Sequence, residues 1–128
     1  MVNYIAILVA AVAGFAFGAV WYMALGKPWM AAVGMTEQPK PNPAVFLMTF
    51  VAQLIMAWML AGALGHLGDV SIVAGLITAA LIWVGFVATT LVVNHRFQGA
   101  KWSLTVIDGG HWLGVLLVMG VVLGLFGV

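Results

Sequence analysis

Four apolar runs, each long enough to cross a bilayer as a helix, occupy most of this 128-residue chain. About 20 helical residues are needed to cross roughly 30 Å of hydrocarbon. Because lipid cannot hydrogen-bond an open strand edge, and because the runs lack strand-like alternation, we predict an all-α fold. The expected architecture is a four-helix transmembrane bundle in a single integral membrane domain, residues 1–128, with spans at about 3–25, 44–64, 70–93 and 103–126.

The composition excludes several classes of function. Hydrophobic residues make up 66% of the chain and charged residues 5%, which leaves too few charges to cover a soluble protein. Four Lys and Arg residues cannot build a basic groove, so we expect no nucleic-acid partner. The chain has no cysteine, and it lacks the GxSxG and HExxH motifs of hydrolases and metalloproteases. We therefore expect no enzymatic activity, no metal and no cofactor.

The first apolar run is predicted to be a retained span rather than a secretory signal peptide. No Lys or Arg precedes it, and it is longer than the apolar core of about 7–15 residues that such peptides have. Four spans place both termini on the same side of the membrane.

All the Lys and Arg residues fall in two loops that share the other side. Lys27 and Lys40 lie in the first loop, and Arg96 and Lys101 lie in the third. Cytoplasmic loops of membrane proteins are enriched in Lys and Arg, so we place these loops in the cytoplasm and both termini on the extracytoplasmic side. The predicted location is the cell inner membrane, as a multi-pass protein.

Two local signals in the first loop mark helix starts. Pro28, within KPWMAAVGM, predicts a short interfacial helix. Asn42 followed by Pro43 is typical of a capped helix start, so the second span is expected to begin there.

Small residues recur every four positions on three of the predicted helices. Such stripes let helices approach closely, which favours a tight bundle or a homo-oligomer. The sequence does not indicate which stripe packs within the chain and which would contact another copy. The predicted packing residues are Ala10, Gly14 and Gly18 on the first helix, Ala57 and Ala61 on the second, and Gly110, Gly114, Gly120 and Gly124 on the fourth.

Polar residues within the spans gather in the half of the bilayer that we assign to the cytoplasmic side. Asp108 and His111 are three residues apart on the fourth predicted helix and therefore share a face. A charged group in lipid is costly, so such groups are expected to face the bundle interior and to pair. The remaining candidates are Asn94, His95 and Arg96 at the end of the third span, Gln53 within the second, and Trp21 and Tyr22 at the end of the first.

Three interpretations of these residues stay open. In the first, Asp108 pairs with Arg96 or His111 and only locks the fold. In the second, Asp108 and His111 bind a ligand or exchange protons within a cavity. In the third, His95, Asp108 and His111 bind a metal ion, an interpretation that has suitable ligand types but no recognised motif.

Several motifs of this chain resemble a family of small bacterial four-span membrane proteins, the domain of unknown function 1761. They are WYMALGKPWMAAVG at residues 21–34, TTLVVNHRF at residues 89–97 and IDGGHW at residues 107–112. The resemblance implies an inner-membrane protein and does not indicate an activity. The family pattern falls on Trp21, Tyr22, Gly26, Lys27, Trp29, Met30, Thr89, Thr90, Asn94, Asp108 and His111.

The favoured function is a small-ligand-binding or proton-coupled transport protein with a polar cavity on the cytoplasmic side. Four spans are few for a transport pathway, so we expect a homo-oligomer. The alternative is a structural or accessory membrane subunit that packs through its Gly and Ala stripes and uses the polar residues only as a lock. The predicted partners are the lipid bilayer, a second copy of the chain and a small-molecule ligand.

Overall fold

The computed structural model describes residues 2–128, and this part of the chain contains helices and no strands. Four of its helices are long and apolar enough to span a membrane, which confirms the predicted all-α four-helix bundle. They are α1 (Tyr4–Ala24), α3 (Pro43–Leu67), the continuous helix Ile72–Phe97, and α6 (Trp102–Phe126). A short helix, α2 (Gly26–Val33), follows α1 as predicted, but it begins two residues before Pro28.

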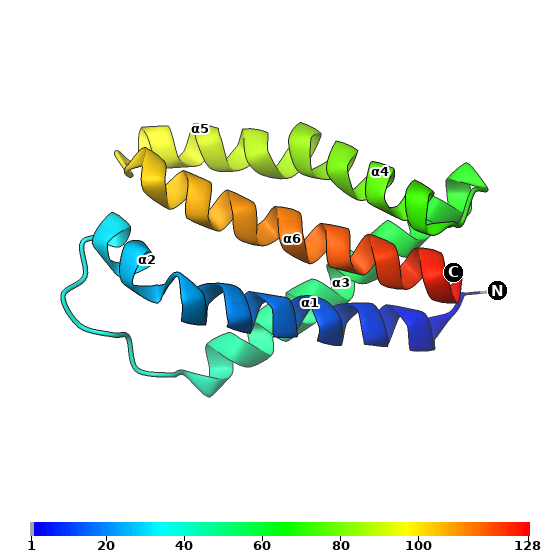
Figure 1. Ribbon diagram of the computed structural model, residues 1–128, viewed down its shortest axis with the longest axis horizontal. Helices are drawn as coiled ribbons and strands as arrows, with labels where there is room; N and C mark the ends of the chain where they lie inside the picture. The colour runs from blue at the N-terminus through cyan, green and yellow to red at the C-terminus, as the bar shows by residue number, and fades with distance from the viewer. Residues whose placement is uncertain (1) are drawn as a thin grey trace.

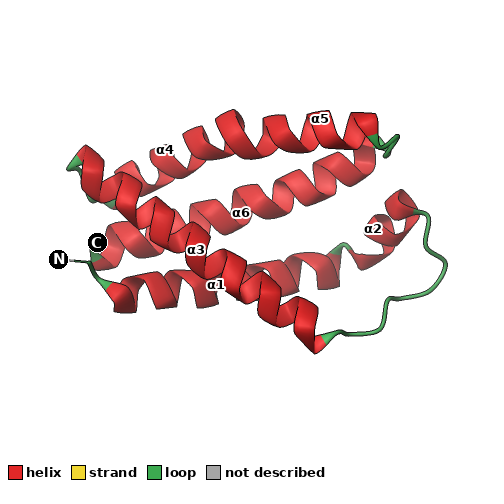
Figure 2. Cartoon of the chain, turned by 180° about the vertical axis from the view of Figure 1, so that it is seen from behind, coloured by secondary structure: helices red, strands yellow, loops and turns green. Residues whose placement is uncertain are grey.

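Helix α6 lies at the centre of the arrangement. It is flanked by α1 on one side and by the third span on the other, and α3 crosses this layer obliquely (Figures 1 and 2). Both termini lie at one end of the bundle, where the Asn3 side-chain amide donates to the Phe126 carbonyl at 3.3 Å. The loop after α2 and the hairpin before α6 lie together at the opposite end, as a four-span chain requires.

The start of α3 follows the predicted capping signal. The Asn42 side-chain oxygen accepts a hydrogen bond from the Ala44 backbone N–H at 3.1 Å, and Pro43 occupies the first helical position. This bond satisfies one of the backbone donors that a helix start leaves free, and proline has no N–H to leave free there.

Replacing Asn42 with alanine is expected to lower the free energy of unfolding by about 1 kcal/mol, because the cap acceptor is lost. The measurement is denaturant unfolding in detergent micelles. Asn42→Asp is the matched control, since a carboxylate accepts the same bond and should keep the stability. Equal losses in the two variants would contradict a capping role for this side chain.

The third span departs from the prediction in its length and in its backbone pattern. It consists of α4 (Ile72–Ile82), the π-helical segment η1 (Trp83–Ala88) and α5 (Thr89–Phe97), and so it extends past the predicted end at residue 93. The hydroxyls of Thr89 and Thr90 donate to the carbonyls of Gly85 and Phe86. These hydroxyls donate hydrogen bonds to backbone carbonyls at the point where the helix returns from the π to the α pattern. The positions are exposed, and lipid has no hydrogen-bond donor to offer these carbonyls. Apolar periodicity does not distinguish the two helix types, so the sequence did not predict η1.

The glycines of α6 near the termini pack against α4. A Cβ atom added to Gly120 would overlap the Gly75 carbonyl, and one added to Gly124 would overlap the Ser71 carbonyl. Gly75, which the small-residue pattern did not single out, would in turn overlap the Gly120 carbonyl. Backbone therefore meets backbone at this crossing, an approach that only residues without a side chain permit.

The other two predicted packing glycines of α6, Gly110 and Gly114, receive aromatic side chains from α1. The Trp21 ring lies at Gly110 and the Phe17 ring at Gly114, in the space that a Cβ atom would take. In the reverse direction, Gly14 and Gly18 of α1 adjoin Gln53 and His111. Ala10 on α1 and Ala57 and Ala61 on α3 are buried in the same core. The predicted packing residues thus contact other helices of the same chain, which supports the tight bundle.

Candidate functional site

Asp108 lies on α6 where this helix meets the last turn of α1. Its carboxylate accepts a hydrogen bond from the Tyr22 hydroxyl at 2.7 Å, and both residues are half-buried. The neighbouring Trp21 indole donates to the Ile107 carbonyl at 3.0 Å. Two consecutive aromatic residues of α1 therefore hold the segment of α6 that carries the acid.

His111 lies one helical turn beyond Asp108 and is buried, with 5% of its surface exposed. Its ring centroid is 4.8 Å from that of Tyr22 and 4.5 Å from that of Trp112. The Nε2 atom lies 2.7 Å from the position that a Cβ atom of Gly18 would occupy, so the glycine makes room for the imidazole. Within residues 2–128 the buried Nδ1 atom has no hydrogen-bond partner.

Gln53 of α3 reaches the same glycine-bearing face of α1. It is 1% exposed, and its Oε1 atom lies 2.9 Å from the position of a Cβ atom on Gly14. Gly14 and Gly18 are one turn apart, about 6 Å along the helix. The Gln53 Oε1 atom is also buried without a partner among the described residues. We call Trp21, Tyr22, Gln53, Asp108 and His111 the Asp108 cluster.

The polar residues at the end of the third span form a separate group. We call His95, Arg96, Trp102 and Thr105 the hairpin cluster. The His95 Nδ1 atom lies 2.7 Å from the Thr105 hydroxyl oxygen, which also accepts from Arg96 Nη2 at 2.8 Å. Arg96 Nη2 donates to the Ala100 carbonyl as well, and the guanidinium carbon lies 3.6 Å from the centre of the Trp102 ring.

The structure therefore divides the predicted site residues. It brings Trp21, Tyr22, Asp108 and His111 together, with Gln53 a turn away. The pairing of Asp108 with Arg96 or His111, which belonged to the first of the three interpretations, is wrong, because the carboxylate accepts from Tyr22 and Arg96 donates to Thr105 and Ala100. Asn94 is exposed on α5 and joins neither cluster.

The metal interpretation is not supported by the geometry. Residues 2–128 hold no group of three or more His, Asp or Glu side chains placed to share one ion. His95 bonds Thr105 in the hairpin cluster, whereas Asp108 and His111 lie in the cluster formed with α1.

Sequence reasoning missed two residues that position these clusters. Thr105 forms a hydrogen bond with His95 and accepts one from Arg96, and its hydroxyl within an apolar run was the available signal. The Trp83 indole, at the start of η1, donates to the Gly109 carbonyl at 2.8 Å, next to Asp108. No local pattern indicates this contact, because its partner is a backbone atom 26 residues away.

These features define a multi-pass membrane protein: four membrane-length helices that carry two polar clusters in one half of the bundle. The family described as "Protein of unknown function (DUF1761)" matches residues 5–124. The chain belongs to this family, which confirms the resemblance carried by its motifs. No curated protein and no solved structure matches the chain.

Proposed function

We propose that this protein is an inner-membrane protein that binds and releases a proton at Asp108, coupled to the binding or transport of a small ligand. One observation carries the proposal. The only acidic residue within the spans is half-buried and bonded to a neutral Tyr22 hydroxyl, with no basic side chain as its hydrogen-bond partner. An intramembrane carboxylate is costly, and such groups commonly mark proton or substrate pathways.

The surrounding atoms favour a ligand that donates hydrogen bonds. The Gln53 Oε1 atom is an acceptor, and His111 Nδ1 accepts in one of the two neutral tautomers. With the carboxylate of Asp108, the cluster offers acceptors to a proton, or to a small ligand with N–H or O–H groups.

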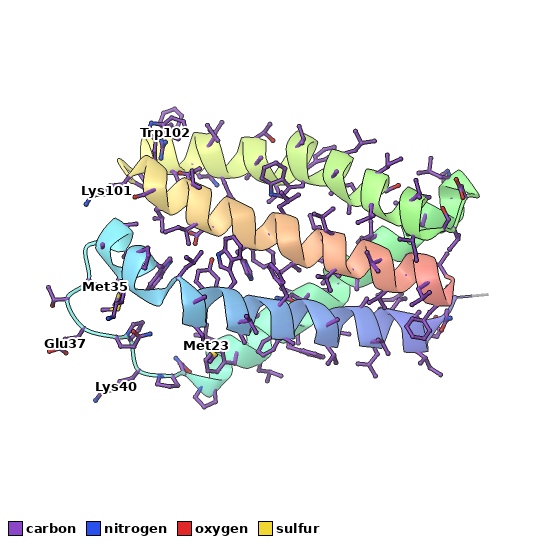
Figure 3. All side chains as sticks on the ribbon, in the orientation of Figure 1. Met23, Met35, Glu37, Lys40, Lys101 and Trp102 are labelled. Carbon is purple, nitrogen blue, oxygen red and sulfur yellow. The ribbon has the colours of Figure 1, made fainter. Side chains whose placement is uncertain are left out.

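The charge distribution supports an orientation with this end of the bundle in the cytoplasm. Lys40 and Lys101 lie at the end away from the termini (Figure 3), as do Lys27 and Arg96. Cytoplasmic loops are enriched in such residues, which supports our proposal that the termini lie on the extracytoplasmic side. We further propose that two or more copies assemble, because four helices packed around their own core leave little room for a transport pathway.

The test is a carboxyl-band infrared titration of the purified protein in detergent. We expect a carboxyl band that changes reversibly with the pH of the medium and disappears in Asp108→Asn. In Tyr22→Phe the band should persist at a shifted frequency, because the hydrogen bond to the carboxyl is removed. Asp69→Asn is the matched control, since Asp69 is exposed between α3 and α4 and its loss should leave the Asp108 band unchanged.

A second candidate function is a structural or accessory membrane subunit. The bonds from Tyr22 to Asp108 and from Trp21 to the Ile107 carbonyl tie α1 to α6, as a structural lock would. In that case Asp108→Asn lowers thermal stability in detergent, and no band attributable to Asp108 responds to pH. That outcome would overturn the proton-binding proposal.

A further inference from the structure

A groove on the surface of the bundle lies between the third span and α6, in the half that carries both polar clusters. Its volume is about 340 Å³. Apart from Thr105 and two tryptophans, every residue that lines it is aliphatic or glycine. The π-helical segment contributes Trp83 and Ala88 to one wall, and α6 contributes Val106 and Leu113 to the other. The groove is separate from the Tyr22–Asp108 contact, because neither residue lines it.

The length of the groove fits one leaflet of a bilayer. Its lining on α6 runs from Trp102 to Leu113, which at 1.5 Å per residue corresponds to about 16 Å. Half of the hydrocarbon core is about 15 Å thick. Trp102 lies at the end where aromatic residues usually mark the headgroup level, so Leu113 lies near the midplane.

A positively charged side chain, that of Arg96, lies at the headgroup end of this groove. Trp102 and Thr105 line the groove, and both contact the Arg96 guanidinium. The hydrogen-bond acceptors of Arg96 are the Thr105 hydroxyl and the Ala100 carbonyl, which are neutral and leave its charge uncompensated. Arg96 Nη1 is buried and has no partner among residues 2–128. Lys101, which is exposed, adds a second positive charge at the same end (Figure 3).

We propose that this groove binds one acyl chain of an anionic phospholipid, whose headgroup phosphate is held by Arg96. The apolar walls suit the chain, and the guanidinium fork suits phosphate oxygens. A basic side chain beside a groove between transmembrane helices is a recognised way to hold a lipid headgroup. Small movement of the Trp102 ring, which is 60% exposed, would give the phosphate access to the unpartnered Nη1 atom.

Native mass spectrometry of the full chain tests this proposal, with phosphatidylglycerol and phosphatidylcholine of identical acyl chains as probes. We expect the wild-type protein to retain phosphatidylglycerol about tenfold more tightly, the effect of one charge-assisted contact. Arg96→Gln should abolish that preference, so that the two lipids are retained about equally. Arg96→Lys should keep part of the preference. Ala88→Phe, which fills the groove, should weaken the binding of both lipids.

Lys40→Gln is the matched control, because Lys40 lies at the same end but in the exposed loop before α3. It should keep the full preference for phosphatidylglycerol, which separates a specific contact from general surface charge. The spectra report only the folded population, so a less stable Arg96→Gln protein still gives the ratio of bound phosphatidylglycerol to bound phosphatidylcholine. Equal retention of the two lipids by the wild type would overturn the proposal, as would a preference that survives Arg96→Gln. Competition by inorganic phosphate alone would indicate an anion site without a lipid chain, which also contradicts it.

Discussion

Replacing Gly75 with valine is expected to lower the free energy of unfolding by about 2–3 kcal/mol. A Cβ atom on Gly75 would overlap the carbonyl of Gly120, and a backbone atom cannot rotate away as a flexible side chain can. Relief requires α4 and α6 to separate. Separation would also loosen the crossing one turn away, where Gly124 meets the Ser71 carbonyl.

The measurement is unfolding by sodium dodecyl sulfate in mixed micelles, followed by circular dichroism or tryptophan fluorescence. Gly62→Val is the matched control, because Gly62 is an exposed helical glycine of α3 with no atom within 4 Å of an added Cβ. The control should be neutral or slightly stabilising, since valine forms helix somewhat better than glycine. If Gly75→Val were no worse than Gly62→Val, the close α4–α6 crossing would be wrong.

A double-mutant cycle at Phe17 and Gly114 is expected to give strongly non-additive losses of stability. The Phe17 ring occupies the space that a Cβ atom on Gly114 would take, so Gly114→Ala forces the ring out of its site. Phe17→Ala removes a half-buried ring that also lies 5.8 Å from the Trp21 ring. Each single change should cost about 1–3 kcal/mol.

The double variant should cost less than the sum of the single changes by about 1 kcal/mol or more, because the alanine at 114 then meets no ring. The same detergent unfolding assay measures all the variants. Combining Phe17→Ala with Gly62→Ala provides the additive control, since these residues share no contact that the structure describes. Additivity within about 0.5 kcal/mol at Phe17 and Gly114 would contradict the proposed fit of ring and glycine.

The chain's apolar runs determined most of the architecture. With 5% charged residues and four long runs, helices that satisfy their own backbone are the available solution in lipid. Local chemistry also determined the start of α3, because the Asn42–Pro43 pair acts on neighbouring backbone atoms, and Pro28 indicated a short helix but not its first residue. Such signals can be read without knowing which helix lies beside which.

The identity of the site was only partly predictable. The spacing of Asp108 and His111 places both on one face, and the chain topology places Trp21 and Tyr22 near the same end. The partner of Asp108 was not predictable, because a tyrosine at the end of a span serves equally well as an interfacial anchor. The hydrogen bond from Tyr22 exists because Gly110 and Gly18 allow α1 to approach α6 closely.

By itself, the sequence determined the number of spans, their approximate limits and the end at which the cations gather, because each depends on composition along a single segment. Tertiary structure alone decided that the Gly and Ala stripes pack within one chain, that Arg96 bonds Thr105 rather than Asp108, and that a groove opens beside η1. These features depend on how helices are rotated and spaced relative to one another. In lipid the apolar faces are nearly equivalent, so steric fit between side chains, rather than hydrophobic periodicity, sets that rotation.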